Sequence, residues 1–546
     1  MSNLSHCLHA FVTEIINGDV KHAVVCPGSR NFPLIKTLVA ADKFVQLHSC
    51  VDERSAGFVA LGLAQSSNST VVLCCTSGTA ALNFYPAIAE AFYSRTPLLI
   101  LTADRPPEAI DNWEGQTIRQ KHVYNQHSVA SFETPVEVDR AAPFKSIAQD
   151  AMNKASEENG PVHVNMPFKE PFYTDWNLAP FQKQGVTDVT QKTSSVPEAL
   201  VKSIQSSEQI LWLNGASTLK ETYNYPSNLL VFSDVISNKN QSTSLWENII
   251  NRHKQLSSPA YPHLIITTGK YFVSKQLRSF LKSNNNIEHW HIGTDESIPT
   301  PFHTNPILAN CKVSEVLHLI EKLYVNESYK AYFDGLNLQL KQNLDRLAWT
   351  GLNEFGVIKD VYNRIPASSV IHISNSMPIR YVGLLERRND LVHFANRGTS
   401  GIDGCTSTAV GYAKGCDELV YLLTGDLAFL YDINGLWQDV IPNNLRIVVL
   451  NNNGGGIFEL IDGPNQHPST QPYQTTEHTK NMDRLADHFN IEYIKVSTDD
   501  AFENAISTFM AATKPVILEV QTERQLNKAF FESYKTTVIN ALRHDE

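Results

Sequence analysis

Gly425-Asp426-Leu427 and Asn451-Asn452-Asn453-Gly454 are the two stretches that decide the fold, because each directly follows a short apolar run. The runs Leu419–Thr424 and Ile447–Leu450 have the length and the aliphatic content of buried strands. If these strands are neighbours in a parallel sheet, both polar motifs emerge at its carboxyl edge, where open α/β sheets bind ligands. The sequence therefore predicts an α/β fold with a ligand site at that edge.

The two motifs supply oxygen donors. The Asp426 carboxylate, the Asn452 amide and the Gly454 carbonyl are hard ligands. Mg²⁺ prefers such ligands and usually keeps some coordination positions for phosphates. A turn at the asparagines and a helix cap at Asp426 would each explain one motif alone. Their order after two strands instead favours a diphosphate held through a metal ion.

Length and composition set the broad class. A chain of 546 residues is long enough for about three or four domains, and 42% hydrophobic with 18% charged residues is typical of a folded protein. The net charge of −11 leaves no basic footprint for nucleic acid. Met1–Asp19 has no signal-peptide pattern, and no apolar run is long enough to cross a membrane. The eight cysteines are scattered without a C-x-x-C pair, which indicates reduced thiols. We expect a cytoplasmic protein that binds neither nucleic acid nor membranes.

Apolar runs alternate with helical periodicity, which predicts three doubly wound α/β domains with mainly parallel sheets. The first domain covers 1–180, a polar linker occupies Asp175–Pro197, and a central domain covers 195–330. The helical connection Tyr329–Leu347 leads to a last domain over 350–546. The other expected strands are His22–Cys26, Val45–Cys50, Thr70–Thr76, Pro97–Ala103, Val162–Met166, Ile210–Asn214, Leu229–Phe232, Leu264–Thr267, Glu288–Ile292, Ser369–Ile373, Val392–Phe394, Ile491–Lys495 and Pro515–Gln521. The expected helices of the first domain are Pro33–Ala41, Ser55–Gln65 and Ala80–Ser94.

Strand-to-helix turns in the first domain carry further candidates. Glu53 follows a strand and begins a helix, so it is either a first-turn acid or a carboxyl group that hydrogen-bonds a cofactor ring. Arg30 and Arg105 also follow strands, and two arginines at one edge suggest a polyanionic substrate. A structural ion pair is the alternative for each arginine. The turn Thr76-Ser77-Gly78 is consistent with cofactor contact or with a plain helix cap.

Taken together, these motifs resemble the thiamine-diphosphate-dependent enzymes, and within them the family of 2-succinyl-5-enolpyruvyl-6-hydroxy-3-cyclohexene-1-carboxylate synthases (MenD). The similarity covers both outer domains, while Lys275 is the single match in the central one. Leu427 stands where the wider class usually has Gly, and Asn31-Phe32 replaces expected small polar residues. The matching motifs are Pro27–Arg30, Asp52–Arg54, Thr76–Ala80, Leu101–Glu108, Gln116–Gln120, Ser374–Ser376, Arg380, Asn396–Gly398, Ser400–Gly404, Gly425–Leu427 and Asn451–Phe458.

The resemblance implies a thiamine-diphosphate-binding fold in which the cofactor lies between the first domain of one subunit and the last domain of its partner. It therefore implies a homodimer, with a tetramer left open. Glu53 would activate the cofactor, while Asp426, Asn452 and the Gly454 carbonyl would hold Mg²⁺ or Mn²⁺. Ile402 would be the apolar prop that bends the cofactor. Further implied contacts are Thr76, Ser77, Gly78, Ser400, Gly401, Asp403, Leu427, Ile457 and Phe458.

The implied reaction is decarboxylation of 2-oxoglutarate and addition of the succinyl-semialdehyde carbanion to isochorismate, with release of CO₂, in menaquinone biosynthesis. Gln116 would hydrogen-bond the reacting oxygens. The other implied substrate contacts are Ser29, Arg30, Arg105 and Lys275 for isochorismate, and Ser376, Arg380 and Arg397 for the carboxylate derived from oxoglutarate.

Two alternatives stay open at this point. One alternative is another thiamine-dependent 2-oxoacid decarboxylase or synthase, which fewer cationic residues at the sheet edge would have favoured. A non-catalytic protein of the same fold would have lost Glu53 or Asp426, and both are present. The segment Gly463–Glu477, rich in Pro, Gln, His and Thr, is predicted to be a mobile loop near the site.

Overall fold

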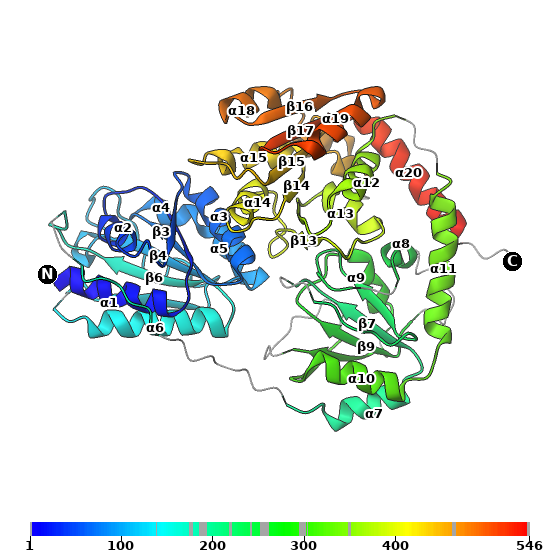
Figure 1. Ribbon diagram of the computed structural model, residues 1–546, viewed down its shortest axis with the longest axis horizontal. Helices are drawn as coiled ribbons and strands as arrows, with labels where there is room; N and C mark the ends of the chain where they lie inside the picture. Colours follow the sequence, from blue (N-terminus) through cyan, green and yellow to red (C-terminus); the bar gives the residue numbers. More distant parts are fainter. Residues whose placement is uncertain are drawn as a thin grey trace.

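The computed structural model describes residues 3–137, 139–173, 178–184, 194–217, 221–240, 243–251, 261–284, 286–293, 302, 304–347, 351–460 and 466–542. The chain forms three sheets of six, five and six strands, and every named pair of neighbouring strands is parallel. We call the layers around these sheets the first, central and last units (Figure 1). The predicted α/β class with parallel sheets is confirmed. Each sheet falls within one predicted domain range, while the boundaries themselves stay a prediction.

The first unit has the strand order β2-β1-β3-β4-β6-β5. Helices α1, α2 and α6 pack on one face of this sheet, and α3, α4 and α5 pack on the other. The strands are β1 (His22–Val25), β2 (Gln46–Ser49), β3 (Val71–Cys75), β4 (Leu98–Asp104), β5 (Ala130–Glu133) and β6 (Val162–Pro167). The helices are α1 (Asn3–Asn17), α2 (Phe32–Val39), α3 (Glu53–Ser67), α4 (Thr79–Asn83), α5 (Tyr85–Ser94) and α6 (Ala142–Glu157).

The last unit has the order β13-β12-β14-β15-β17-β16, which repeats the order of the first unit strand for strand. Helices α14, α15 and α18 pack on one face, and α12, α13, α19 and α20 contribute to the core on the other. The strands are β12 (Val370–Ile373), β13 (Val392–Phe394), β14 (Val420–Gly425), β15 (Leu445–Asn451), β16 (Glu492–Val496) and β17 (Val516–Gln521). The helices are α12 (Glu354–Arg364), α13 (Met377–Leu384), α14 (Cys405–Lys414), α15 (Asp426–Tyr431), α16 (Ile457–Leu460), α17 (Gln471–Thr475), α18 (Met482–His488), α19 (Asp499–Ala511) and α20 (Arg524–Ala541).

The central unit has the order β11-β10-β9-β7-β8, a doubly wound arrangement in which the strand order reverses at β7 and β9. One hydrophobic core runs from this unit into the last one, so the two are packed together. Helix α11 lies beside α20 of the last unit (Figure 1). The strands are β7 (Ile210–Asn214), β8 (Leu230–Ser233), β9 (Leu264–Thr268), β10 (Glu288–Ile292) and β11 (Ile307–Ala309). The helices are α7 (Glu198–Ser206), α8 (Trp246–Ile250), α9 (Lys275–Lys282), α10 (Val313–Leu323) and α11 (Ser328–Leu344).

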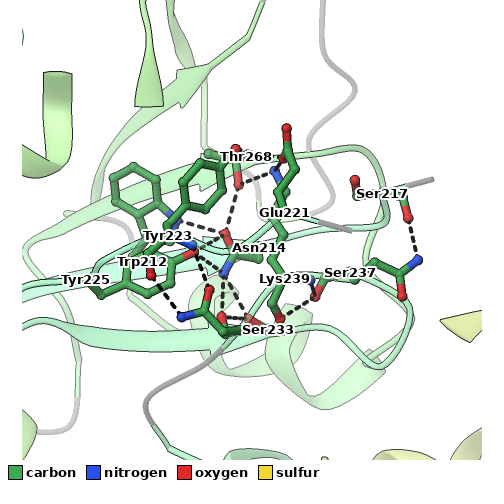
Figure 2. A network of polar contacts seen from close by, with 12 residues as sticks. Trp212, Asn214, Ser217, Glu221, Tyr223, Tyr225, Ser233, Ser237, Lys239 and Thr268 are labelled. Atoms are coloured by element: carbon green, nitrogen blue, oxygen red, sulfur yellow. Dashed lines mark hydrogen bonds and ion pairs between the residues drawn. The ribbon is translucent and has the colours of Figure 1, made fainter. Parts of the chain in front are cut away.

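The carboxyl edge of the central sheet is filled by its own side chains (Figure 2). Asn214, at the end of β7, accepts hydrogen bonds from Trp212 Nε1 and Thr268 Oγ1, both at 2.9 Å, and donates to Ser233 Oγ at 2.8 Å. Lys239, only 6% exposed, lies 3.1 Å from a Glu221 carboxylate oxygen. A doubly wound sheet usually binds its ligand at this position. Here the network satisfies these polar groups internally.

Helix α3 of the first unit packs directly against α14 of the last unit. The two helices touch through Gly62 and Gly411, because a Cβ on Gly411 would overlap the Val59 carbonyl and one on Gly62 would overlap the Thr408 carbonyl. Both helices are buried along most of their length, which explains why neither shows a polar face. This contact ties the first and last units of one chain together.

Several expectations need correction. The helix expected over Ala80–Ser94 is divided into α4 and α5, because Pro86 lacks the N–H that a continuous helix needs. Helices α1 and α6 and strands β5 and β11 were missed. Of the expected linker Asp175–Pro197, residues 178–184 and 194–197 have no regular structure, and the rest lies outside the described residues. Residues 463–465 lie outside the described residues, whereas 466–477 contain a 3₁₀ turn at Pro468–Thr470 and α17.

Two general features bear on function. All eight cysteines are thiols that form no disulfide, and seven of them are buried. Within the described ranges, no helix combines the length and the apolar character that a membrane crossing requires.

Candidate active site

A cavity of about 620 Å³ lies at the carboxyl edge of the last sheet. It sits beyond the carboxyl ends of the paired strands β12 and β14, where the strand order of this sheet reverses. We call it the β12–β14 cavity. The loops after β12, β13, β14 and β15 all contribute to its lining, and α9 of the central unit adds Lys275 and Arg278.

Asp426 is the first residue of α15 and is 2% exposed. Its Oδ1 accepts a hydrogen bond from the Leu427 N–H (2.6 Å) and its Oδ2 accepts one from the Gly454 N–H (2.9 Å). His478 Nε2 lies 3.1 Å from Oδ2. Burial raises the pKa of Asp426, and the Gly454 N–H and His478 oppose that rise. Since β14 and β15 are parallel neighbours, with Gly425 opposite Leu450, the two motifs do emerge side by side as predicted.

Asn452 presents an oxygen that has no partner. Its Nδ2 donates a 2.6 Å hydrogen bond to Glu354 Oε1, and the other Glu354 oxygen accepts from the Tyr381 hydroxyl at 3.1 Å. Asn452 Oδ1 is buried and has no hydrogen-bond partner in the part of the chain that the structure describes. Because buried polar atoms are nearly always paired, this oxygen fits a cation ligand. Together with Asp426 and Gly454, which also line the cavity, it makes an oxygen donor set suited to Mg²⁺.

Apolar and small residues form other parts of the wall. Gly401 and Asp403 belong to the loop between β13 and α14, and neither lines the cavity. The predicted cofactor contacts that do line the cavity are Ser400, Ile402, Asp426, Leu427, Asn452, Ile457 and Phe458.

Cationic side chains gather on the same cavity. Arg380 Nη1 donates to the Ser376 carbonyl, and Arg397 Nη1 donates to Asn375 Oδ1 at 2.8 Å. Burial lowers the pKa of Arg380, and the nearby charge of Arg397 lowers it further. The buried Nε of Arg397 has no partner among the described residues. Lys275 and Ser376 also line the cavity, so this wall attracts anions.

A second cavity of about 750 Å³ adjoins the first one. The two share Lys275, Arg380 and Arg397 as lining residues, and the second adds Arg387 and Lys535. Its acidic lining residues are Asp234 and Glu247, and burial raises the pKa of the Glu247 carboxyl to about 8. Five cationic side chains thus line this cavity beside two carboxyl groups.

The first-unit candidates lie at the edge of the first sheet, and none of them lines the β12–β14 cavity. Glu53 is the half-buried first residue of α3, as predicted, and follows the N-cap Asp52. Thr76 and Ser77 are buried, and Gly78, with a φ of +89°, lies against the backbone of Gln116. The structure thus brings Gln116 to the Thr76-Ser77-Gly78 turn.

The two arginines of the first unit differ in their surroundings. Arg30 is 4% exposed, donates to the Phe168 carbonyl (3.0 Å) and to Glu170 (2.8 Å), and stacks on Phe172. Arg105 is half-buried, and its Nε has no partner within the described ranges. Burial lowers the pKa of Arg30, and the charge of Arg105 lowers it further, so the two cations are close. Ser29 is exposed beside them.

Sequence reasoning missed several residues at these edges. Glu354 and His478 belong to no motif. The fold alone brings Glu354 to Asn452 and His478 to Asp426. Asn375 stood inside a matched motif, where its hydrogen bonds to the 396–401 loop could not be foreseen. Gln120 also lay inside a motif and accepts a hydrogen bond from the Gly78 N–H at 3.1 Å.

Comparison with known proteins agrees with this geometry. Residues 7–128 match the family described as thiamine pyrophosphate enzyme, N-terminal TPP binding domain, and residues 380–520 match its C-terminal TPP binding domain. The chain is 35% identical to the 2-succinyl-5-enolpyruvyl-6-hydroxy-3-cyclohexene-1-carboxylate synthase of Cytophaga hutchinsonii, over 95% of this chain and 96% of that one. The chain belongs to this synthase family.

Other members give the same picture. The synthase of Christiangramia forsetii is 34% identical and that of Flavobacterium johnsoniae 33% identical, each over 94% of this chain and 96% of the relative. The protein is therefore a thiamine diphosphate-dependent synthase of menaquinone biosynthesis, with a cofactor-binding domain at each end of the chain. Most residues that line the β12–β14 cavity lie within the C-terminal matched region, 380–520. Glu53 lies within the N-terminal matched region, 7–128.

Proposed function

We propose that this synthase decarboxylates 2-oxoglutarate and joins the remaining four-carbon unit to isochorismate, forming 2-succinyl-5-enolpyruvyl-6-hydroxy-3-cyclohexene-1-carboxylate and CO₂. The observation that carries the proposal is one cavity that combines oxygen ligands, Asp426 and Asn452, with the cations Lys275, Arg380 and Arg397. Both substrates are dicarboxylates, and arginine pairs with carboxylates through two hydrogen bonds.

We assign thiamine diphosphate to the β12–β14 cavity, with its diphosphate bound through Mg²⁺ or Mn²⁺. Asp426, Asn452 and the Gly454 carbonyl would hold the metal, since the unpaired Asn452 oxygen and the buried carboxylate fit such an ion. When bound, the cofactor supplies a carbon nucleophile and an electron sink for loss of CO₂. Ile402, Ile457 and Phe458 would form its apolar wall. Ser400, Gly401, Asp403 and Leu427 would complete its surroundings.

The substrate carboxylates divide between the two groups of cations. We assign Ser376, Arg380 and Arg397 to 2-oxoglutarate, and Lys275 with Arg30 and Arg105 to isochorismate. Ser29 and Gln116 would add hydrogen bonds at the isochorismate position. Glu170, which pairs with Arg30, has a 62% exposed side chain, so it can give way to a substrate carboxylate. An analogue without a carboxylate would leave buried cations unpaired, which makes the pocket selective.

A complete site requires a second copy of the chain. Glu53 would hydrogen-bond the aminopyrimidine ring of the cofactor and the Thr76-Ser77-Gly78 turn would contact it, yet neither lines the cavity of the same chain. Apolar side chains are exposed where the segment before Glu53 meets the last unit, namely Val51, Tyr431 and Trp437 at 44%, 53% and 52%. Arg54 donates a hydrogen bond to the Tyr431 carbonyl, and Asp52 accepts one from Asn434 Nδ2. The exposed apolar side chains therefore belong to one surface. We therefore propose a homodimer that places Glu53 of one copy at the cavity of the other. We also propose a cytoplasmic location, because cysteine thiols that form no disulfide suit that compartment.

The direct test is consumption of isochorismate by the purified protein with 2-oxoglutarate, thiamine diphosphate and Mg²⁺, followed by mass analysis of the product. Consumption that requires every component and yields the succinyl-cyclohexene adduct would support the proposal. Loss of CO₂ from 2-oxoglutarate while isochorismate is untouched would contradict the assigned acceptor. No decarboxylation at all would contradict the proposed reaction.

A further inference from the structure

We propose that Glu90, on α5 of the first unit, is a positioning residue for Arg397 in the β12–β14 cavity. The inference rests on the proposed function, which assigns Arg397 to a carboxylate of 2-oxoglutarate. Glu90 belongs to none of the motifs that carry the cofactor site, and its side chain does not line the cavity. It acts through the loop that carries Arg397.

The Glu90 carboxylate is 1% exposed, and both of its oxygens accept hydrogen bonds. Its Oε1 accepts a hydrogen bond from the Gly398 N–H at 2.7 Å. Its Oε2 accepts from the Thr399 N–H at 2.7 Å and from the Thr399 hydroxyl at 2.8 Å. These three hydrogen bonds join a helix of the first unit to a loop of the last unit. They hold the two residues that directly follow Arg397.

The same loop is held from its other side by Asn375. Asn375 Nδ2 donates to the Asn396 carbonyl (2.7 Å) and to the Gly401 carbonyl (2.5 Å), while its Oδ1 accepts from Arg397. The loop is thus fixed between the end of β12 and helix α5. Gly398 permits this arrangement, because a Cβ there would lie 2.5 Å from the Glu90 carbonyl oxygen. Arg397, Gly398 and Ser400 of this loop line the cavity.

The contact needs a carboxylate and not merely a polar group. All three partners donate hydrogens, so an amide in place of the carboxylate would direct its own N–H hydrogens at one of these donors. Burial raises the pKa of Glu90, and the N–H groups of Thr399 and Gly398 oppose that rise by stabilising the charged form. Burial lowers the pKa of half-buried Arg397, and the charges of Asp234, Tyr271 and Glu90 oppose that fall. The hydrogen bonds of Glu90 to the loop therefore position the arginine.

The experiment compares the holoenzyme, with thiamine diphosphate and Mg²⁺, with its Glu90→Gln and Thr399→Val variants. Thr399→Val keeps the shape and removes only the hydroxyl donor. Glu157→Gln, at an exposed position on α6, is the matched control. The readouts are KM and kcat for each substrate, and hydrogen exchange of the peptide that covers 396–402.

For Glu90→Gln we expect faster exchange in 396–402 and a KM for 2-oxoglutarate raised roughly tenfold or more, as for loss of a hydrogen bond to a charged group. The KM for isochorismate and the exchange of the central sheet should stay near wild type. Thr399→Val should shift the same two readouts by a smaller factor, and it carries the test alone if Glu90→Gln does not fold.

Unchanged exchange in 396–402 would overturn the proposal. So would faster exchange with an unchanged KM for 2-oxoglutarate, because that result leaves Glu90 a purely structural role. Wild-type protein that turns over neither substrate would instead refute the proposed function, and this inference would fall with it.

Discussion

Replacing Glu354 with Ala should weaken metal binding at the β12–β14 cavity without touching a metal ligand. Glu354 is 3% exposed, and its carboxylate fixes the Asn452 amide by accepting from Nδ2 at 2.6 Å. That hydrogen bond directs the unpaired Oδ1 of Asn452 away from Glu354. In the Ala variant the amide is free to rotate, and its NH₂ group can then face the ion in place of the oxygen.

The size of the effect follows from the role of such supporting groups. Loss of a partner that orients a ligand typically lowers metal affinity 10–100-fold, which corresponds to about 1.4–2.7 kcal/mol. Glu354→Gln is the matched control, because its oxygen can still accept from Asn452 and its NH₂ can donate to the Tyr381 hydroxyl. We expect that variant to stay within about threefold of wild type.

Mn²⁺ is the useful probe, since the signal of the free ion in electron paramagnetic resonance falls as it binds. Titrations with thiamine diphosphate present would compare wild type, Glu354→Ala, Glu354→Gln and Asn452→Ala, with thermal unfolding as a check of the fold. If Glu354→Ala binds Mn²⁺ as tightly as Glu354→Gln while Asn452→Ala is weakened, the orienting role is wrong. If Asn452→Ala also binds normally, Asn452 is not a ligand.

Three further predictions concern catalysis, acid stability and packing. Glu53→Gln should abolish turnover while cofactor affinity, measured by titration, stays largely intact; near-normal turnover would remove Glu53 from the mechanism. Burial lowers the pKa of His372 to about 3 from 6.5, so stability present above pH 6.5 is lost as the pH falls toward 3, at ~1.4 kcal/mol per pH unit. His372→Phe should therefore flatten the fall of the unfolding temperature between pH 6.5 and 5, and an unchanged slope would contradict this. Gly411→Ala should cost about 1–3 kcal/mol by overpacking against Val59, whereas Gly335→Ala, with open space around it, should not lower the unfolding temperature.

The strands were predictable to the extent that they are buried on both faces. β3, β4 and β15 are continuous apolar runs, and their boundaries were predicted within about two residues. β5 and β11 were missed because they are edge strands, half-buried or exposed over most of their length. The repeat of strand order between the outer units was also invisible, since the two sequences share no apparent repeat.

The site was predictable where chemistry follows directly from a strand end. The proximity of Asp426 and Asn452 could be predicted because parallel neighbours deliver consecutive strand ends to one edge; their role as metal ligands stays a prediction. Glu354 and Glu90 could not be found in this way, because their partners are 98 and 308 residues distant in sequence. A single acidic residue at the start of α12 or within α5 has no local signal that separates it from a surface residue.

The repeated architecture bears on the proposal that a second copy of the chain completes the site. In the last unit, the segments after β14 and β15 carry the proposed oxygen ligands, and those after β12 and β13 carry the arginines proposed to bind one carboxylate. In the first unit, the equivalent loops after β1 and β3 carry Arg30 and the Thr76-Ser77-Gly78 turn, and Glu53 follows β2. As far as the structure describes them, neither of these edges carries both the proposed metal donor set and Glu53. Within one chain, α3 and α14 pack closely through their glycines, so bringing the two edges together would have to disturb that contact. The homodimer that we propose would instead supply the complementary edge from a second copy.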